Sequence, residues 1–232
     1  MIFIFLEFLR ENEYLQALAL FGAVMLMLFG IAFHEFSHAL SANALGDRTA
    51  REQGRLTLNP LVHLDPFGTL LLFLVGFGWG RPTPVNPYAL RNGPRTGMAT
   101  VALAGPISNL IFAGVLAMVM RLGWVPWHDP FVIGGTAGWA LSDYVGLFLS
   151  AGILLNVILA VFNLLPVAPL DGFKVAVGLL PMDLARPVAQ LERHGMVILM
   201  VLFFMPFLVG LSFFGDVMLP AAEGIAGALT GS

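Results

Sequence analysis

The chain has 232 residues, of which 58% are hydrophobic and only 11% are charged. A soluble domain carries about 25% charged residues, so this composition excludes an ordinary water-soluble globule. The 14 acidic and 11 basic residues give a net charge of -3 without a basic stripe, which argues against nucleic-acid binding, and the lack of cysteine excludes thiolate metal sites and a cysteine nucleophile.

Four apolar stretches of the chain reach the length of about 20 residues that a helix needs to cross a bilayer. In chain order they cover approximately residues 14–45, 98–122, 141–165 and 196–219. In the fourth stretch, Pro206 is expected to kink the helix rather than end it. A fifth apolar run, over residues 67–79, has only about 13 residues and is too short to cross comfortably.

The charged loops indicate how the short run is arranged. If it dips into the bilayer and returns, nine of the eleven Lys and Arg residues lie on one side, which the positive-inside rule identifies as the cytoplasm. A full crossing would export Arg81, Arg91 and Arg95 and weaken this bias, so a re-entrant segment is favoured. The flanking residues 54–60 and 81–87 are bounded by Gly, Pro and Asn and are expected to be extended.

The sequence therefore predicts an all-α polytopic membrane protein with about four long transmembrane helices, a short re-entrant apolar segment and minor extended segments. No repeat, low-complexity tract or linker divides the chain. Residues 1–232 are thus expected to form a single membrane-embedded domain, with a core over about 14–180 and a C-terminal helix over about 194–219.

The first long helix contains an HExxH motif, His34-Glu35-Phe36-Ser37-His38. Residues four apart share a helix face, so both imidazoles can bind one metal ion, and Glu35 lies close enough to act on a metal-bound water. A polar surface patch is the alternative interpretation. It is disfavoured because such side chains in so apolar a segment are costly unless they are paired, metal-bound or next to water.

A catalytic zinc normally has three protein ligands and one open position, so a third ligand must come from elsewhere. The candidates are the other three histidines and the membrane-adjacent acids, which include Asp143 and Asp171. Asp171 follows the third long helix directly, in the sequence NLLPVAPLDG over residues 163–172. The prolines should end that helix and leave a non-helical segment at membrane depth, which would let Asp171 turn inward.

Three motifs, in this order, resemble the site-2 protease family of intramembrane zinc metalloproteases. They are HEFSH at 34–38, AGPISN at 104–109 and NLLPVAPLDG at 163–172. The resemblance covers roughly residues 25–180. The apolar insertion between the first two motifs is similar to that of a subgroup without a PDZ domain.

This resemblance implies that His34, His38 and Asp171 bind Zn2+. It also implies that Glu35 activates the attacking water and that Asn163 hydrogen-bonds near the scissile carbonyl. From the residues alone, Asn163 could instead cap the end of its helix, and Asp171 could be an ordinary turn acid before a glycine.

Three further polar residues have both a structural and a functional interpretation. His63 and Asp65 could contact the substrate, hydrogen-bond a metal ligand or cap the short apolar run. Asn109 could serve the packing of the second long helix, together with the glycine and proline of its motif, or support the site from within. In the second case we expect it to hydrogen-bond the broken segment after Asn163.

The sequence thus predicts a zinc metalloendopeptidase that hydrolyses peptide bonds in or near transmembrane segments of membrane proteins, as in regulated intramembrane proteolysis. Its expected partners are a substrate helix and the lipid bilayer, and an unwound substrate could add as a strand to residues 54–60 or 81–87. The expected location is a prokaryotic cell membrane, with the active site toward the cytoplasm. The alternatives are an inactive zinc-binding membrane protein, a metal transporter, or a membrane protease acting on soluble chain ends.

Overall fold

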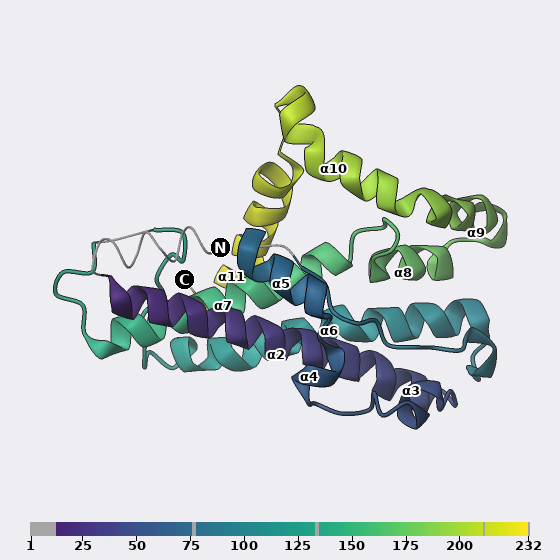
Figure 1. Cartoon of the computed structure of the whole chain (residues 1–232), viewed down its shortest axis with the longest axis horizontal. Helices are drawn as coiled ribbons and strands as arrows, with labels where there is room; N and C mark the ends of the chain where they lie inside the picture. Colours follow the sequence, from purple (N-terminus) through teal and green to yellow (C-terminus); the bar gives the residue numbers. More distant parts are fainter. Residues whose placement is uncertain (1–12, 76–77, 133–134, 211, 232) are drawn as a thin grey trace.

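The computed structural model describes residues 13–75, 78–132, 135–210 and 212–231. Within these ranges the chain is helical, and the only β-type pairing is one isolated bridge. This architecture confirms the predicted all-α class (Figure 1).

Within the described ranges, three helices are long and apolar enough to cross a membrane: α2 (Tyr14–Ala44), α6 (Pro94–Arg121) and α7 (Leu141–Asn163). They pack against one another in all three pairings and form the bundle in Figure 1. Their bounds agree closely with the first three predicted stretches. The helix α2 ends where Gly46 takes a left-handed φ of 107°, a conformation that glycine adopts without steric cost.

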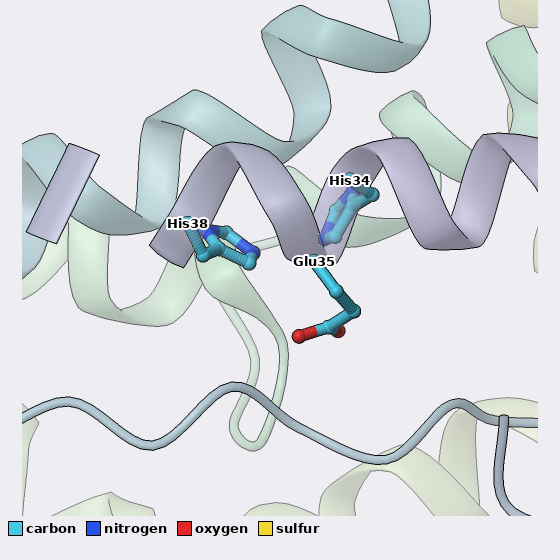
Figure 2. Close-up of side chains that lie close together, drawn as sticks. All are labelled: His34, Glu35 and His38. Carbon is cyan, nitrogen blue, oxygen red and sulfur yellow. The ribbon is translucent and has the colours of Figure 1, made fainter. Parts of the chain in front are cut away.

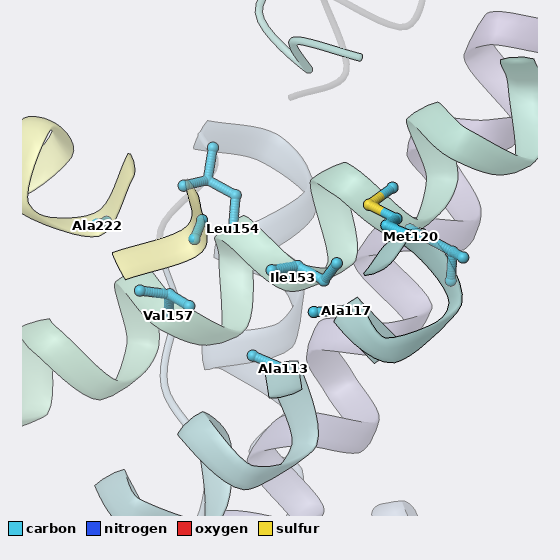
Figure 3. Close-up of a cluster of buried hydrophobic side chains, with 9 residues drawn as sticks. Ala113, Ala117, Met120, Ile153, Leu154, Val157 and Ala222 are labelled. Atoms are coloured by element: carbon cyan, nitrogen blue, oxygen red, sulfur yellow. The ribbon is translucent and has the colours of Figure 1, made fainter. Parts of the chain in front are cut away.

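An apolar core of the bundle lies between α6, α7 and the C-terminal helix α11 (Leu219–Thr230). Figure 3 shows Ala113, Ala117 and Met120 of α6 against Ile153, Leu154 and Val157 of α7, with Ala222 of α11 beside them. Alanine at three of these positions lets the backbones approach closely, which is how helices associate where there is no water to exclude.

The fourth predicted helix is divided. Helix α10 (Gly195–Val209) continues through Pro206 and ends just before Gly210, whose φ is 73°. Beyond residue 211, which lies outside the described ranges, a π-helical turn (Phe213–Met218) leads into α11. With 15 residues, α10 is about 22 Å long, short of the roughly 30 Å of a hydrocarbon core, and it extends away from the bundle in Figure 1.

The short apolar run forms α5 (Pro66–Val75), and its residues 76 and 77 lie outside the described ranges. Its two ends meet, because Leu64 and Gly80 form the isolated antiparallel bridge and the Arg81 amide donates to the His63 carbonyl over 2.6 Å. The run therefore leaves and rejoins the protein at one place, as a re-entrant segment requires.

Between α2 and α6 the chain also forms α3 (Thr49–Glu52), α4 (Pro60–His63) and the 3-10 turn η1 (Pro87–Ala89). The predicted extended segments on either side of the short run contain no strand. Residues 81–86, which we call the cover segment, are nevertheless non-helical. They run alongside the second half of α2 and make hydrogen bonds to Glu35 and to Asp47.

After α7 the chain turns through residues 164–170 and enters α8 (Asp171–Leu179), which packs on α6. It continues through α9 (Met182–Ala189) and the 3-10 turn η2 (Gln190–His194) to α10. Glycine is required at the start of α8, because a Cβ on Gly172 would overlap the backbone of Leu164 and Leu165. This tight return brings Asp171 into the bundle.

Candidate metal centre

The HExxH motif lies in the second half of α2, on the face that meets α6. The donor atoms of His34, Glu35 and His38 lie within 4.8 Å of one another. The two imidazole centroids are 4.6 Å apart and the rings are nearly perpendicular, at 89°. Figure 2 shows the three side chains projecting from neighbouring turns, with Glu35 directed toward an extended stretch of chain.

Asp171 meets both imidazoles with a single oxygen. Its Oδ2 is 3.0 Å from Nε2 of His34 and 3.1 Å from Nε2 of His38. All three side chains are buried. The structure thus brings together the first helix of the bundle and the start of α8, more than 130 residues later in the chain.

The opposite nitrogen of each ring has its own partner. Nδ1 of His34 lies 2.6 Å from Oδ1 of Asn109, and Nδ1 of His38 lies 2.7 Å from the Val101 carbonyl. Because a carbonyl oxygen only accepts, each Nδ1 must donate its hydrogen. In a neutral imidazole, Nε2 then carries a lone pair, which is the form that binds a metal.

This arrangement fits a metal cation. Two imidazole lone pairs and a carboxylate oxygen face one another across about 3 Å in an apolar bundle, and a cation placed among them would satisfy all three. Two histidines and one carboxylate are also a donor set found in catalytic zinc sites.

The neighbouring helix leaves space for these groups at Gly105. A Cβ at this position would stand 2.5 Å from Nε2 of His34 and 2.5 Å from Nε2 of His38. The glycine of the AGPISN motif is therefore required by the site itself. Sequence reasoning could assign it only to helix packing, because the contact depends on how α2 and α6 cross.

Glu35 is half-buried and is held by the cover segment. Its Oε2 accepts a hydrogen bond of 2.8 Å from the Thr83 amide, and its backbone carbonyl accepts one of 3.0 Å from the Thr83 hydroxyl. One carboxylate oxygen is thereby fixed next to the two imidazoles. No motif pointed to Thr83, because the contact joins distant segments.

Lys174 lies one turn after Asp171 on α8, and its Nζ is 3.8 Å from Oδ1 of Asp171. This oxygen is the one that faces away from the imidazoles. The lysine charge thus favours a carboxylate that directs Oδ2 inward and Oδ1 toward the ammonium group.

The structure does not bring Asn163 into this hydrogen-bonded set. Asn163 is the last residue of α7, and its Nδ2 donates a hydrogen bond of 2.9 Å to the Leu159 carbonyl of the same helix. This bond uses one of the two Nδ2 hydrogens, and the catalytic role of Asn163 stays a prediction.

His63 and Asp65 also make local contacts. Nε2 of His63 lies 2.7 Å from the Thr57 carbonyl, while its Nδ1 is buried with no hydrogen-bond partner among the described residues. Oδ1 of Asp65 accepts from the first two amides of α5 after Pro66, at 3.0 and 2.9 Å. The Asp65 contacts are those of a cap on α5, whereas the His63 side chain contacts the segment before α4. A role of either residue toward substrate or ligand stays a prediction.

Asn109 supports the site differently from our expectation. It contacts His34 directly, and its Nδ2 donates to the Gly30 carbonyl and to Asn156 rather than to the segment after Asn163. Sequence reasoning missed Asn156 as a contributor. The available signal was an amide side chain within a strongly apolar stretch, and the structure shows that this amide is fully buried.

The comparisons with known proteins agree with this geometry. The family model of peptidase family M50 matches residues 21–207. YwhC of Bacillus subtilis is 40% identical over 185 residues, which are 79% of this chain and 80% of that protein. Rip2 of Mycobacterium tuberculosis H37Rv is 33% identical over 216 residues, which are 89% of this chain and 76% of that protein.

Both relatives carry the words zinc metalloprotease in their names, as does MJ0611 of Methanocaldococcus jannaschii, which is 30% identical over 63% of this chain and 64% of its own length. A comparison with solved structures finds no significant match. The family match covers most of the chain and includes all three motifs. The chain therefore belongs to peptidase family M50, the site-2 protease family, and is an integral membrane zinc metalloprotease.

Proposed function

We propose that this metalloprotease cleaves peptide bonds in or near the transmembrane segments of membrane proteins, as in regulated intramembrane proteolysis. The position of the HExxH motif carries the proposal. His38 lies six residues before the end of α2, and His34 lies ten residues before it. At the helical rise, the two residues lie about 9 and 15 Å from that end of the helix. A peptide bond must therefore reach membrane depth to be attacked.

In this proposal His34, His38 and Asp171 hold the zinc ion through the three atoms that converge in the structure. When bound, zinc supplies a Lewis acid that polarises the carbonyl and lowers the pKa of a coordinated water toward about 7. Asn109 and the Val101 carbonyl hold the two rings in the tautomer that binds metal.

Glu35 acts as the general base and then as the general acid. Its carboxylate takes a proton from the attacking water and passes it to the leaving amide nitrogen, so that one water adds across the peptide bond and one amine is released. The Thr83 amide fixes one oxygen of Glu35 and leaves the other for the proton. Asn163 is proposed to donate to the oxyanion through the second hydrogen of its side-chain amide.

The substrate helix must be unwound before attack, because its peptide bonds are enclosed in their own hydrogen bonds. The cover segment and residues 54–60 are the proposed receiving surfaces. Within the cover segment the amides of Arg81, Thr83 and Asn86 already donate to the protein, and Pro82 and Pro84 have no amide hydrogen. Val85 has the remaining amide of the segment, so a substrate strand would chiefly use its own amides against the carbonyls of this segment.

We further propose that the site opens toward the cytoplasm of a prokaryotic cell. The loop after α2 contains Arg48, Arg51 and Arg55, and the positive-inside rule assigns such a loop to the cytoplasmic side. The relatives described above come from bacteria and an archaeon, which supports a prokaryotic cell membrane.

The decisive experiment compares the parent with Glu35→Gln after reconstitution with a transmembrane peptide. The substituted amide keeps an oxygen that accepts from Thr83 but cannot take a proton, so we expect parent-like zinc content and a loss of cleavage of at least about 100-fold. A soluble peptide of the same cleaved sequence is the matched control and should be cut much more slowly by the parent. Equal cleavage of both peptides would contradict intramembrane specificity, and a zinc-loaded parent that cuts neither would favour an inactive zinc-binding protein.

A further inference from the structure

Two asparagines form a buried polar contact between the helices that surround the metal centre. Asn109 of α6 and Asn156 of α7 are both fully buried in helices that are otherwise strongly apolar. Nδ2 of Asn109 donates to Oδ1 of Asn156 over 3.2 Å and to the Gly30 carbonyl of α2 over 3.1 Å. Nδ2 of Asn156 donates a hydrogen bond of 2.9 Å to the Gly152 carbonyl of its own helix.

These contacts determine which way each amide faces. The carbonyls of Gly30 and Gly152 can only accept, so the atoms that meet them must be the NH2 groups. Asn156 consequently presents its oxygen to Asn109, and Asn109 presents its oxygen to Nδ1 of His34. A directed series of hydrogen bonds thus runs from α7 to a proposed metal ligand.

The backbone of α2 leaves room for this series. A Cβ on Gly30 would overlap Oδ1 of Asn156 and lie 3.3 Å from Nδ2 of Asn109. Ser150, another buried polar residue of α7, provides a contrast. Its hydroxyl accepts from the His128 amide and, among the described residues, has no hydrogen bond to the metal centre. Burial of a polar group in α7 therefore does not by itself imply a link to the metal centre.

We propose that Asn156 is a positioning residue for the metal centre. It holds the Asn109 amide so that Nδ1 of His34 keeps the hydrogen and Nε2 keeps the lone pair. Without the oxygen of Asn156, the Asn109 NH2 group loses one of its two acceptors, and the amide can turn to face Nδ1 of His34 with a donor. That orientation requires the other tautomer of His34, whose Nε2 cannot bind a metal. This inference rests on the ligand role of His34 in the proposed function.

The test measures zinc affinity in detergent by competition with a chromophoric chelator, so it needs no substrate. Asn156→Leu has a similar volume but no acceptor, and we expect it to weaken zinc binding by about 10- to 100-fold, the range typical for loss of a group that orients a metal ligand. Asn156→Asp should stay within a few-fold of the parent, because a carboxylic acid kept neutral by its apolar surroundings offers both an acceptor and a donor. The visible spectrum of the cobalt-substituted proteins should change in Asn156→Leu only.

Two matched controls separate positioning from general loss of packing. Ser150→Ala removes a buried polar group from the same helix and should lower the melting temperature without weakening zinc binding. Gly30→Ala displaces Asn156 from the opposite helix and should weaken zinc binding, whereas Gly22→Ala, whose Cβ meets only the Phe148 ring, should not.

Parent-like zinc affinity in folded Asn156→Leu would overturn the inference, and so would an equal loss in Ser150→Ala. If Asn156→Leu fails to fold, Asn156→Asp becomes the test. This variant retains the hydrogen bonds to Asn109 and to the Gly152 carbonyl, so loss of zinc from the folded protein would contradict positioning by Asn156. A parent that binds zinc but cuts no transmembrane peptide would defeat only the proposed protease specificity and leave this inference standing.

Discussion

Two regions along α2 each bury an aspartate, and the two carboxylates are satisfied in different ways. Just beyond the end of α2, Asp47 accepts from the Thr49 amide at 3.0 Å, the Thr49 hydroxyl at 2.5 Å and the Asn86 amide at 2.7 Å. Inside the bundle, Asp171 directs one oxygen at two imidazole nitrogens. The Asp47 carboxylate faces three hydrogen-bond donors. Oδ2 of Asp171 instead faces two imidazole nitrogens, each of which has a lone pair when its ring is neutral.

This difference separates a structural carboxylate from a ligand. An anion surrounded by fixed donors is already compensated and stabilises the turn that contains it. Lys174 contacts only Oδ1 of Asp171, so Oδ2 and the two imidazole lone pairs it faces are compensated only by a cation placed among them. Burial alone does not distinguish the structural carboxylate from the ligand, because Asp47 and Asp171 are both buried.

The largest expected effect is therefore on zinc binding. Asp171→Ala removes the carboxylate that contacts both imidazoles, and we expect its zinc affinity to fall by more than about 100-fold, beyond the usual effect of an outer hydrogen-bond partner. Cleavage should be lost with the metal. Asp47→Asn, the matched change in the other region, should bind zinc like the parent.

Equilibrium dialysis followed by metal analysis measures both variants on the same scale. Full zinc occupancy in Asp171→Ala would show that Asp171 is a turn acid like Asp47 and would remove it from the ligand set. A loss of zinc in Asp47→Asn would mean that the end of α2 also determines the metal site.

A second prediction concerns the space around the imidazoles. Gly105→Ala places a methyl group 2.5 Å from both Nε2 atoms, so the rings or the helices must move, and we expect zinc binding and cleavage to fall by at least about 10- to 100-fold. Gly114→Ala is the control on the same helix, because its Cβ meets only the Leu229 side chain at 3.9 Å. Zinc content and cleavage of a transmembrane peptide should be unchanged in Gly114→Ala, and parent-like values in Gly105→Ala would show that the site does not need this glycine.

Features that depend on local spacing were predictable from the sequence. The four-residue interval of His34 and His38 fixes a common helix face, and the prolines after Asn163 predict the end of α7 and the inward turn before Asp171. The three long helices followed equally well from apolar stretches of sufficient length.

Features that depend on how distant segments meet were not predictable. The contact of Asn109 with Asn156 depends on how two helices cross, and the contact of Glu35 with Thr83 depends on the path of a loop. Neither can be derived from the periodicity of the sequence. The fourth stretch is one continuous apolar run, yet the helix passes through Pro206 and ends just before Gly210, where the backbone takes a left-handed conformation. Hydropathy measures apolar content and carries no information about that φ angle.

The smallest effect, and the sharpest test of the structural carboxylate, is the pH dependence of stability at Asp47. Burial alone would raise the pKa of Asp47, but the Thr49 side chain, the Thr49 amide and the Asn86 amide outweigh it and hold the pKa below its ordinary value of 3.8. Because the folded pKa is depressed, the ionised group stabilises the fold fully above the unfolded pKa, and this contribution is lost as the pH falls through the folded pKa.

Asp47→Asn replaces one accepting oxygen with a donor, so the variant should be less stable than the parent by about 1.5–3 kcal/mol near neutral pH, the usual contribution of hydrogen bonds to a charged group. Unfolding in detergent of the chelator-treated proteins, from about pH 7 to about pH 3, measures this gap. The gap should stay constant down to the ordinary pKa of the group and then shrink. A gap of the same size at every pH would show that the donors around Asp47 stabilise the turn without regard to its charge, and the contrast with Asp171 would then rest on geometry alone.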